Sequence, residues 1–267
     1  MALALNIGKC TLLGNYRENN EDSIEVKQFP DMSLCIVADG MGGQAAGEIA
    51  SKRAIEVVPR ELRKNLTQSA TQDQARAVIR KAVVQANEEI ITMGSLDRDL
   101  KNMGTTIVLA LWRKGQDMFI ANLGDSRAYL LRSGNLQQLT NDHSLVAEQV
   151  RRGLITPQQA EESEMQSVLL RALGAHPEVE IDTDEVEIIP RDVLLLCSDG
   201  LTRMVTEPEI AGALQAETVP SAAAERLIAL ANENGGIDNV TVIVVRFEDD
   251  ANKGWFSWMR RGSAKKD

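Results

Sequence analysis

Two aspartates follow two apolar stretches of the sequence in the same way. The run LCIVA ends in Asp39-Gly40, and the run LLLCS ends in Asp199-Gly200. Taken singly, each Asp-Gly pair is typical of a turn, and its glycine permits either a turn or the close approach of a ligand. A carboxylate at the end of a buried strand, however, loses its hydration and needs a partner. The repetition therefore favours a functional site over two unrelated turns.

Four more carboxylates stand beside apolar stretches: Glu21, Asp22, Asp125 and Asp238. If the strands involved share one end of a sheet, these acids converge with the two aspartates above. Like charges at close range repel, and each raises the pKa of the others unless cations lie between them. Divalent metal ions remove that repulsion.

Two such ions, about 3.5–4 Å apart, can activate a bridging water for attack on phosphorus. Oxygen ligands suit magnesium, manganese or calcium, whereas two histidines, His143 and His176, are too few for a histidine-rich zinc site. Arg17 lies close to the acids in sequence, and its planar guanidinium matches a phosphate dianion. The residue types therefore indicate metal-assisted hydrolysis of a phosphoester.

Composition narrows the classes of protein that remain. The chain has 267 residues, 29 Lys and Arg, 39 Asp and Glu, and a formal net charge of −10. Hydrophobic residues make up 43% and charged residues 25%, which is typical of a globular protein. The acidic balance disfavours nucleic acid as a partner, and no apolar run approaches the roughly 18 residues of a membrane span. Three cysteines without a C-x-x-C pair indicate reduced thiols and a cytoplasmic protein.

The helices and strands that must position these residues can be predicted from the spacing of apolar residues along the chain. Helical spacing predicts helices over about 44–62 and 73–93, and residues 145–172 look like two short helices inserted between strands. Helix starts are indicated at Thr71, Thr156 and Thr206. No linker divides the body, so we expect one α+β domain over residues 1–250. Apolar runs of strand length predict β-strands, and their lack of alternation suggests that both faces of these strands are buried. The runs are 34–38, 106–111, 118–121, 128–131, 193–197 and 240–245.

Several short motifs appear in a fixed order between residues 17 and 241. They are RENNED (17–22), DGMGG (39–43), GTT (104–106), GDSR (124–127), LTNDHS (139–144), RALG (171–174), SDG (198–200) and GGIDNVT (235–241). In this order they resemble the metal-dependent serine/threonine protein phosphatases of type 2C, in their compact bacterial form. The resemblance implies an α-β-β-α sandwich, two packed antiparallel β-sheets flanked by helices, with a small helical flap at about 145–172 that is tied to substrate choice.

The resemblance also implies roles for individual residues. Asp39 would bridge two metals, helped by the Gly40 carbonyl, and Asp199 and Asp238 would hold the second metal; these three aspartates are the expected catalytic residues. Arg17 would grip the substrate phosphate. The remaining acids would complete the metal shell: Asp22 and Glu21 in or next to it, and Asp125 with Asp199 at a weaker third site.

The activity implied is hydrolysis of phosphoserine and phosphothreonine in proteins. It would use two or three manganese or magnesium ions and direct attack by a metal-bridging hydroxide, without a phosphoenzyme. The implied setting is a cytoplasmic monomer that opposes a bacterial serine/threonine kinase. The identity of the general acid stays open, because Met41 stands where animal members have histidine and Gln44 stands where many bacterial members have it. Two other readings remain, a catalytically weak module that binds phosphoproteins and a hydrolase of small phosphoesters.

Residues 251–267 differ in kind from the body. They carry five basic residues against one acidic residue, together with Trp255, Phe256 and Trp258. Indole rings and basic side chains both favour a membrane surface, so weak membrane contact through this tail is one hypothesis. Recruitment to an acidic protein patch is another. An inert tail is the reading we favour, because chain termini are commonly loose.

Overall fold

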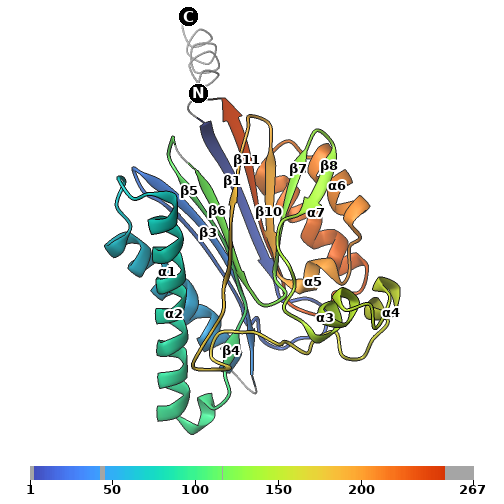
Figure 1. The fold of residues 1–267 in the computed structure, drawn as a ribbon. Helices are drawn as coiled ribbons and strands as arrows, with labels where there is room; N and C mark the ends of the chain where they lie inside the picture. Colours follow the sequence, from blue (N-terminus) through green and yellow to red (C-terminus); the bar gives the residue numbers. More distant parts are fainter. Residues whose placement is uncertain (1–2, 43–45, 116, 250–267) are drawn as a thin grey trace, which may run out of the picture.

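A computed structural model describes residues 3–42, 46–115 and 117–249 of the chain. Two antiparallel β-sheets pack face to face, and helices cover both outer surfaces (Figure 1). The first sheet has the order β1 (Leu3–Leu12), β11 (Val240–Asp249), β10 (Val193–Cys197), β7 (Arg127–Arg132) and β8 (Asn135–Gln138). The second has the order β2 (Asp22–Gln28), β3 (Met32–Met41), β5 (Ile107–Arg113), β6 (Met118–Leu123) and β9 (Asp182–Val186), with β4 (Gly104–Thr105) paired to β3.

The helices divide between the two sheets. Two long helices, α1 (Ala46–Asn65) and α2 (Gln72–Leu96), cover the second sheet, and a 3-10 turn at Arg98–Leu100 follows them. The first sheet is covered by α5 (Asp199–Thr202), α6 (Glu207–Ala216) and α7 (Pro220–Glu233). The expected α+β class and sandwich architecture are confirmed. Residues 145–172 contain two short helices as predicted, α3 (Leu145–Arg151) and α4 (Pro157–Glu161), which we call the flap (Figure 1).

Three apolar layers explain why the central strands show little alternation. On β3, Ile36 packs toward α1 and α2, while its neighbour Val37 packs between the sheets. On β10, Leu195 faces the helices of the first sheet and Leu196 faces the second sheet. Both faces of these strands are therefore buried, so both must be apolar.

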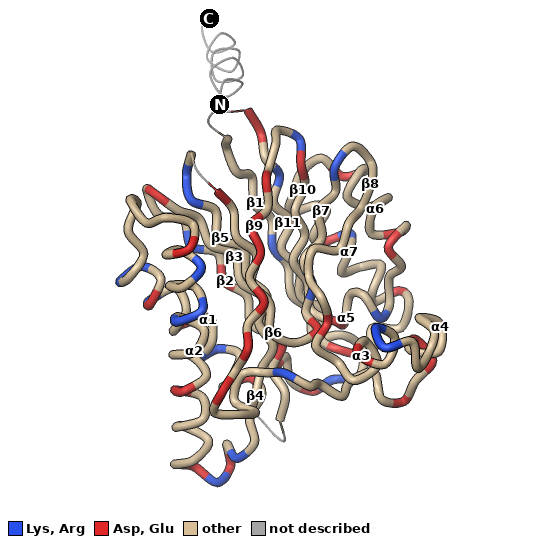
Figure 2. Tube along the Cα trace, in the orientation of Figure 1, with Lys and Arg blue, Asp and Glu red and all other residues tan. Residues whose placement is uncertain are grey.

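The helix starts read from the sequence are also confirmed. Thr71 caps α2 and Thr156 caps α4, each in a capping box with the glutamine three residues later. Thr206 and Glu209 form the equivalent box at α6. Strands β1, β2, β4, β8 and β9 were not predicted, because short, edge or half-exposed strands lack long apolar runs. Acidic residues follow β9 along the edge of the second sheet (Figure 2).

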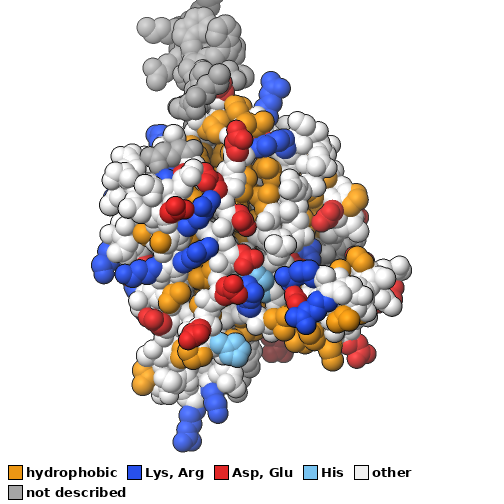
Figure 3. All heavy atoms as spheres, viewed as in Figure 1, with side chains coloured by type: hydrophobic (Ala, Val, Ile, Leu, Met, Phe, Trp, Pro, Cys, Tyr) orange, Lys and Arg blue, Asp and Glu red, His pale blue; other side chains and the backbone are white. Residues whose placement is uncertain are grey.

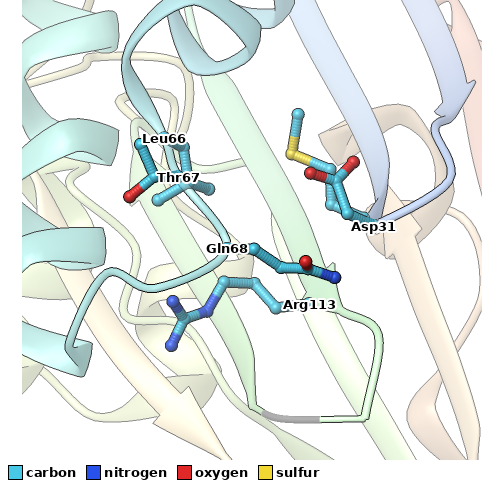
Figure 4. Close-up of a pocket in the computed structure, with 6 residues that line it drawn as sticks. Asp31, Leu66, Thr67, Gln68 and Arg113 are labelled. Atoms are coloured by element: carbon cyan, nitrogen blue, oxygen red, sulfur yellow. The ribbon is translucent and has the colours of Figure 1, made fainter.

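A small cavity lies beside β5, near the turn between β2 and β3 (Figure 4). Its volume of about 10 Å³ has room for roughly one water molecule. Arg113 lines it, donates two hydrogen bonds to Asp117 at 2.6 and 2.7 Å, and reaches the Ala70 carbonyl at 2.6 Å. The cavity thus lies beside a structural ion pair.

Among the described residues, none of the helices has the length and apolar character that a membrane span requires.

Candidate metal centre

Asp39 lies near the end of β3, and its backbone is fixed by two threonines. The Asp39 N–H donates to Thr106 Oγ1 at 3.0 Å, and the Thr106 N–H donates to the Asp39 carbonyl at 2.8 Å. The Thr105 hydroxyl donates to the same carbonyl at 2.8 Å. These two threonines of the GTT motif therefore hold the aspartate on which the site depends.

The glycines after the two aspartates permit close backbone contact. Strand β3 continues through Gly40 to Met41, so the turn considered for this dipeptide is absent. A Cβ on Gly40 would lie 2.2 Å from the Gly47 carbonyl oxygen in α1. Gly200 lies in α5, where a Cβ would be 2.0 Å from the Asn239 carbonyl oxygen. Larger residues at either position would push apart the elements that carry the acids.

The acids come from both sheets and meet at one end of the sandwich, opposite the described chain ends (Figures 1 and 2). Asp22 is the direct strand partner of Asp39 in the second sheet. Asp199 begins α5 after β10, and Asp238 directly precedes β11 in the first sheet. Asp125 lies in the connection from β6 to β7, which links the sheets. The expectation of one shared sheet end was therefore too simple.

Three of these carboxylates bond to donors of the protein. Ser198 Oγ donates to Asp22 Oδ2 at 2.8 Å. Arg203 lies 2.7 Å from Asp199, and Arg17 lies 2.7 Å from Asp238. The guanidinium of Arg17 is half-exposed, so it remains accessible from solvent.

The environment opposes ionisation of five of these acids, Glu21, Asp22, Asp39, Asp125 and Asp199. Burial raises the pKa of Asp39 well above its usual range, and the nearby Asp22, Asp199, Asp125 and Asp238 raise it further. Burial also raises the pKa of Asp22 to about 7 and that of Asp125 to about 8, again with help from Asp199. The pKa of Asp199 is raised by burial. Burial also raises the pKa of Glu21, although Arg17 acts to lower it. The charge of Asp238 acts on Glu21, Asp22 and Asp39, and that of Asp199 acts on Asp22, Asp39 and Asp125, so the six acids form one cluster.

The cluster suits a hard divalent cation. Its donors are carboxylate oxygens, and two of them, Oδ1 of Asp22 and Oδ1 of Asp199, are buried without a hydrogen-bond partner among the described residues. Within the ranges described above, no three carboxylates close around one point as a cation's ligands do. Arg203 and Arg17 each hold one aspartate of the cluster instead. The chemistry of the donors fits the metal, and the ligand roles assigned from the sequence stay a prediction.

A cavity of about 960 Å³ separates the flap from α5 and α6. Asp125 and Asp199 line it beside the cluster, and Val146, Val150 and Met204 form part of its walls. In the space-filling view the flap projects from the body, with hydrophobic side chains along its lower edge (Figure 3). The cavity is large enough to admit a peptide side chain next to the acids.

The base of the flap is tied to β7 by a partly buried ion pair. Arg127 donates to both oxygens of Asp142 at 2.6–3.0 Å and to the Tyr129 hydroxyl at 2.9 Å. His143 is buried, and its Nδ1 accepts the Gly124 N–H at 3.2 Å. Burial lowers the pKa of His143.

Three supporting residues were not assigned a role from the sequence: Ser198, Arg203 and Asn239. The Asn239 side chain accepts the Glu21 N–H at 2.8 Å and donates to the Leu13 and Asn19 carbonyls. Ser198 and Asn239 stand inside two of the motifs, SDG and GGIDNVT, whereas Arg203 lies one helical turn after Asp199 and outside every motif. Gln44, weighed in the argument about the general acid, lies outside the described residues.

Comparison with known proteins agrees with this geometry. Residues 16–233, most of the chain, match the family model described as protein phosphatase 2C. The chain belongs to the protein phosphatase 2C family. It is 42% identical over 233 residues to the serine/threonine phosphatase stp of Listeria welshimeri, covering 87% of this chain and 92% of that protein. The family expected from the motifs is thus confirmed, and with it the expectation of an enzyme.

Solved structures of the family share the fold. The serine/threonine phosphatase of S. agalactiae matches with a TM-score of 0.85 and 33% identity, over 91% of this chain and 99% of that chain. The catalytic domain of the phosphatase PstP, solved in complex with two manganese ions, matches with a TM-score of 0.79 and 38% identity. That match covers 92% of this chain and 100% of the PstP chain.

Proposed function

We propose that this protein is a divalent metal-dependent phosphatase that hydrolyses phosphoserine and phosphothreonine in proteins. The observation that carries the proposal is the cluster of six acids with Arg17 at its edge. Buried carboxylates that repel one another need cations, and a half-exposed arginine beside them is placed to hold an anion. Membership of the protein phosphatase 2C family and the manganese-bound relative support the same reading.

The proposal assigns work to individual residues. Asp39, Asp199 and Asp238 would hold two manganese or magnesium ions, with the Gly40 carbonyl, Asp22 and Glu21 completing the shell and Asp125 serving a third ion. When bound, these ions supply a polarised water as nucleophile and neutralise charge on the phosphoryl group. Arg17 binds the phosphate oxygens and orients the phosphorus toward the acids. The Thr105 and Thr106 hydrogen bonds keep Asp39 in register while this happens.

A phosphatase assay with matched variants tests the proposal. Phosphate release from a phosphothreonine peptide should require Mn²⁺ or Mg²⁺ and stop in EDTA. Asp39→Asn, Asp199→Asn and Asp238→Asn should each lose nearly all turnover. Asp184→Asn, an exposed acid on β9, is the matched control and should retain full activity. Peptide binding without phosphate release by the wild type would instead support a phosphoprotein-binding module.

A further part of the proposal concerns the location, the oligomeric state and the opposing kinase of the enzyme. We infer a cytoplasmic monomer that reverses the action of a serine/threonine kinase, supported by the activity of the family and the three free cysteines. Light scattering of the purified chain tests the monomer. Comparing phosphoproteins in cells with and without the protein tests the kinase relationship. The membrane contact considered for residues 251–267 falls outside the described residues, and co-sedimentation of full-length and 1–250 protein with anionic vesicles tests it.

A further inference from the structure

Two loops beside the cluster are fastened together and carry two exposed apolar side chains. The Asn15 N–H donates to the Gly236 carbonyl at 2.7 Å, and Asn15 Nδ2 donates to the Gly235 carbonyl at 2.9 Å. Two residues further along each loop, Arg17 and Asp238 form their 2.7 Å ion pair. Tyr16 lies between Asn15 and Arg17, and Ile237 lies between Gly236 and Asp238. Because these flanking residues are in contact across the two loops, Tyr16 and Ile237 lie opposite each other.

Both side chains face solvent despite their size. Tyr16 is 74% exposed and Ile237 is 45% exposed. The backbone beneath them is closely packed: Gly14 has φ +81°, and a Cβ there would lie 2.2 Å from the Asp238 carbonyl oxygen. The two side chains therefore project into solvent from a closely packed backbone. A tyrosine with few rotatable bonds offers a large contact area at small entropic cost.

We propose that Tyr16 and Ile237 form an apolar contact for the substrate residue next to the phosphorylated serine or threonine. The inference rests on the proposed function, in which Arg17 holds the phosphate. Successive residues of an extended peptide are about 3.3–3.6 Å apart, so the neighbour of the phosphoresidue passes over the residues that flank Arg17 and Asp238. Glu18 and Glu21 stand in the same loop and disfavour an acidic neighbour. The favoured substrate thus has an aliphatic or aromatic residue there.

The test measures kcat/KM for a panel of phosphothreonine peptides. The reference peptide has alanine at every flanking position, and the others replace one flanking alanine by leucine or aspartate. Each peptide is assayed with the wild type, with Tyr16→Ala, with Ile237→Ala and with the double variant. Leu96→Ala is the matched control, because Leu96 is the last residue of α2 and its side chain is 83% exposed. A melting curve accompanies each variant.

We expect the wild type to prefer leucine to alanine by about five- to tenfold at one flanking position, the size typical of a small apolar contact. The double variant should reduce this ratio to nearly one and leave turnover of the alanine peptide within about twofold. Leu96→Ala should keep the wild-type ratio. A wild type indifferent to leucine, or a double variant that keeps the preference, would overturn the inference while the proposed function stands. No turnover of any peptide would overturn the proposed function, and this inference with it.

Discussion

Replacing Asp39 by asparagine should stabilise the metal-free protein while it abolishes catalysis. Asp39 lies among four aspartates that raise its pKa, and it is the strand partner of Asp22. One like charge at this range shifts a pKa by one unit or more, so its removal should stabilise the folded state by about 1–3 kcal/mol at pH 8. For a chain of this length that corresponds to a rise in melting temperature of about 2–12 °C.

The dependence on pH provides the second part of this prediction. The folded-state pKa of Asp22 is about 7 and that of Asp125 about 8, both above the ordinary value of 3.8. Between about pH 4 and pH 8 the folded protein therefore binds more protons than the unfolded chain. Stability then falls as pH rises, by about 1.4–2.7 kcal/mol per pH unit for one to two extra protons. Above both folded-state values the contribution of Asp22 and Asp125 is fully lost.

Thermal melting in EDTA at pH 6, 7 and 8 measures both effects. The wild type should melt progressively lower as the pH rises, and Asp39→Asn should melt higher than the wild type at pH 8. Saturating Mn²⁺ should reverse the order, because a cation that binds only the folded state stabilises the wild type most. Asp184→Asn is the control for loss of one acidic charge. An Asp39→Asn variant that melts below the wild type in EDTA at pH 8 would refute the idea of repelling carboxylates.

Three further predictions concern other residues. Arg17→Ala should raise KM for a phosphopeptide more than it lowers kcat, as steady-state kinetics will show; an unchanged KM would remove Arg17 from the phosphate site. Arg127→Met should cost about 3–5 kcal/mol in urea unfolding, because it leaves Asp142 without its main partner, and a loss under 1 kcal/mol would contradict a structural role for the pair. Cys10, which is half-buried, should react first with a thiol reagent, since burial raises the pKa of both other cysteines to about 12; rapid reaction of all three in the native protein would be inconsistent with this burial.

Much of the site could be predicted because its parts leave local signals. Asp39 and Asp199 each end a fully apolar run, and a charged residue at that point is costly unless it has a function. The capping boxes at Thr71 and Thr156 are equally local, since each depends on two residues three positions apart. Motif order then identified the family.

What escaped prediction depends on contacts between distant segments. The pairing of β1 with β11 joins residues more than 200 positions apart, and β1 itself has mixed polarity. Arg17 was expected to face a phosphate, but its partner Asp238 in the structure comes from the other end of the chain. Asn239 satisfies three backbone groups in the connection between β1 and β2, more than 200 positions away in the sequence.

The pairing of β1 with β11 has a consequence for how the protein is made. Strand β1 is an edge strand whose neighbour in the sheet is β11, so the first strand to leave the ribosome waits for the last. The same holds at the acids, where Arg17 and Glu21 are held by Asp238 and Asn239. Such non-local closure is slow compared with local helix formation.

The acidic cluster is therefore completed only when synthesis has reached β11. A nascent or truncated chain that ends before residue 238 has neither Asp238, the partner of Arg17, nor Asn239, which holds Glu21 in the same loop. The topology thus delays formation of the acidic cluster until synthesis is nearly finished. An unfinished copy of the enzyme is therefore unable to remove phosphate from the proteins around it.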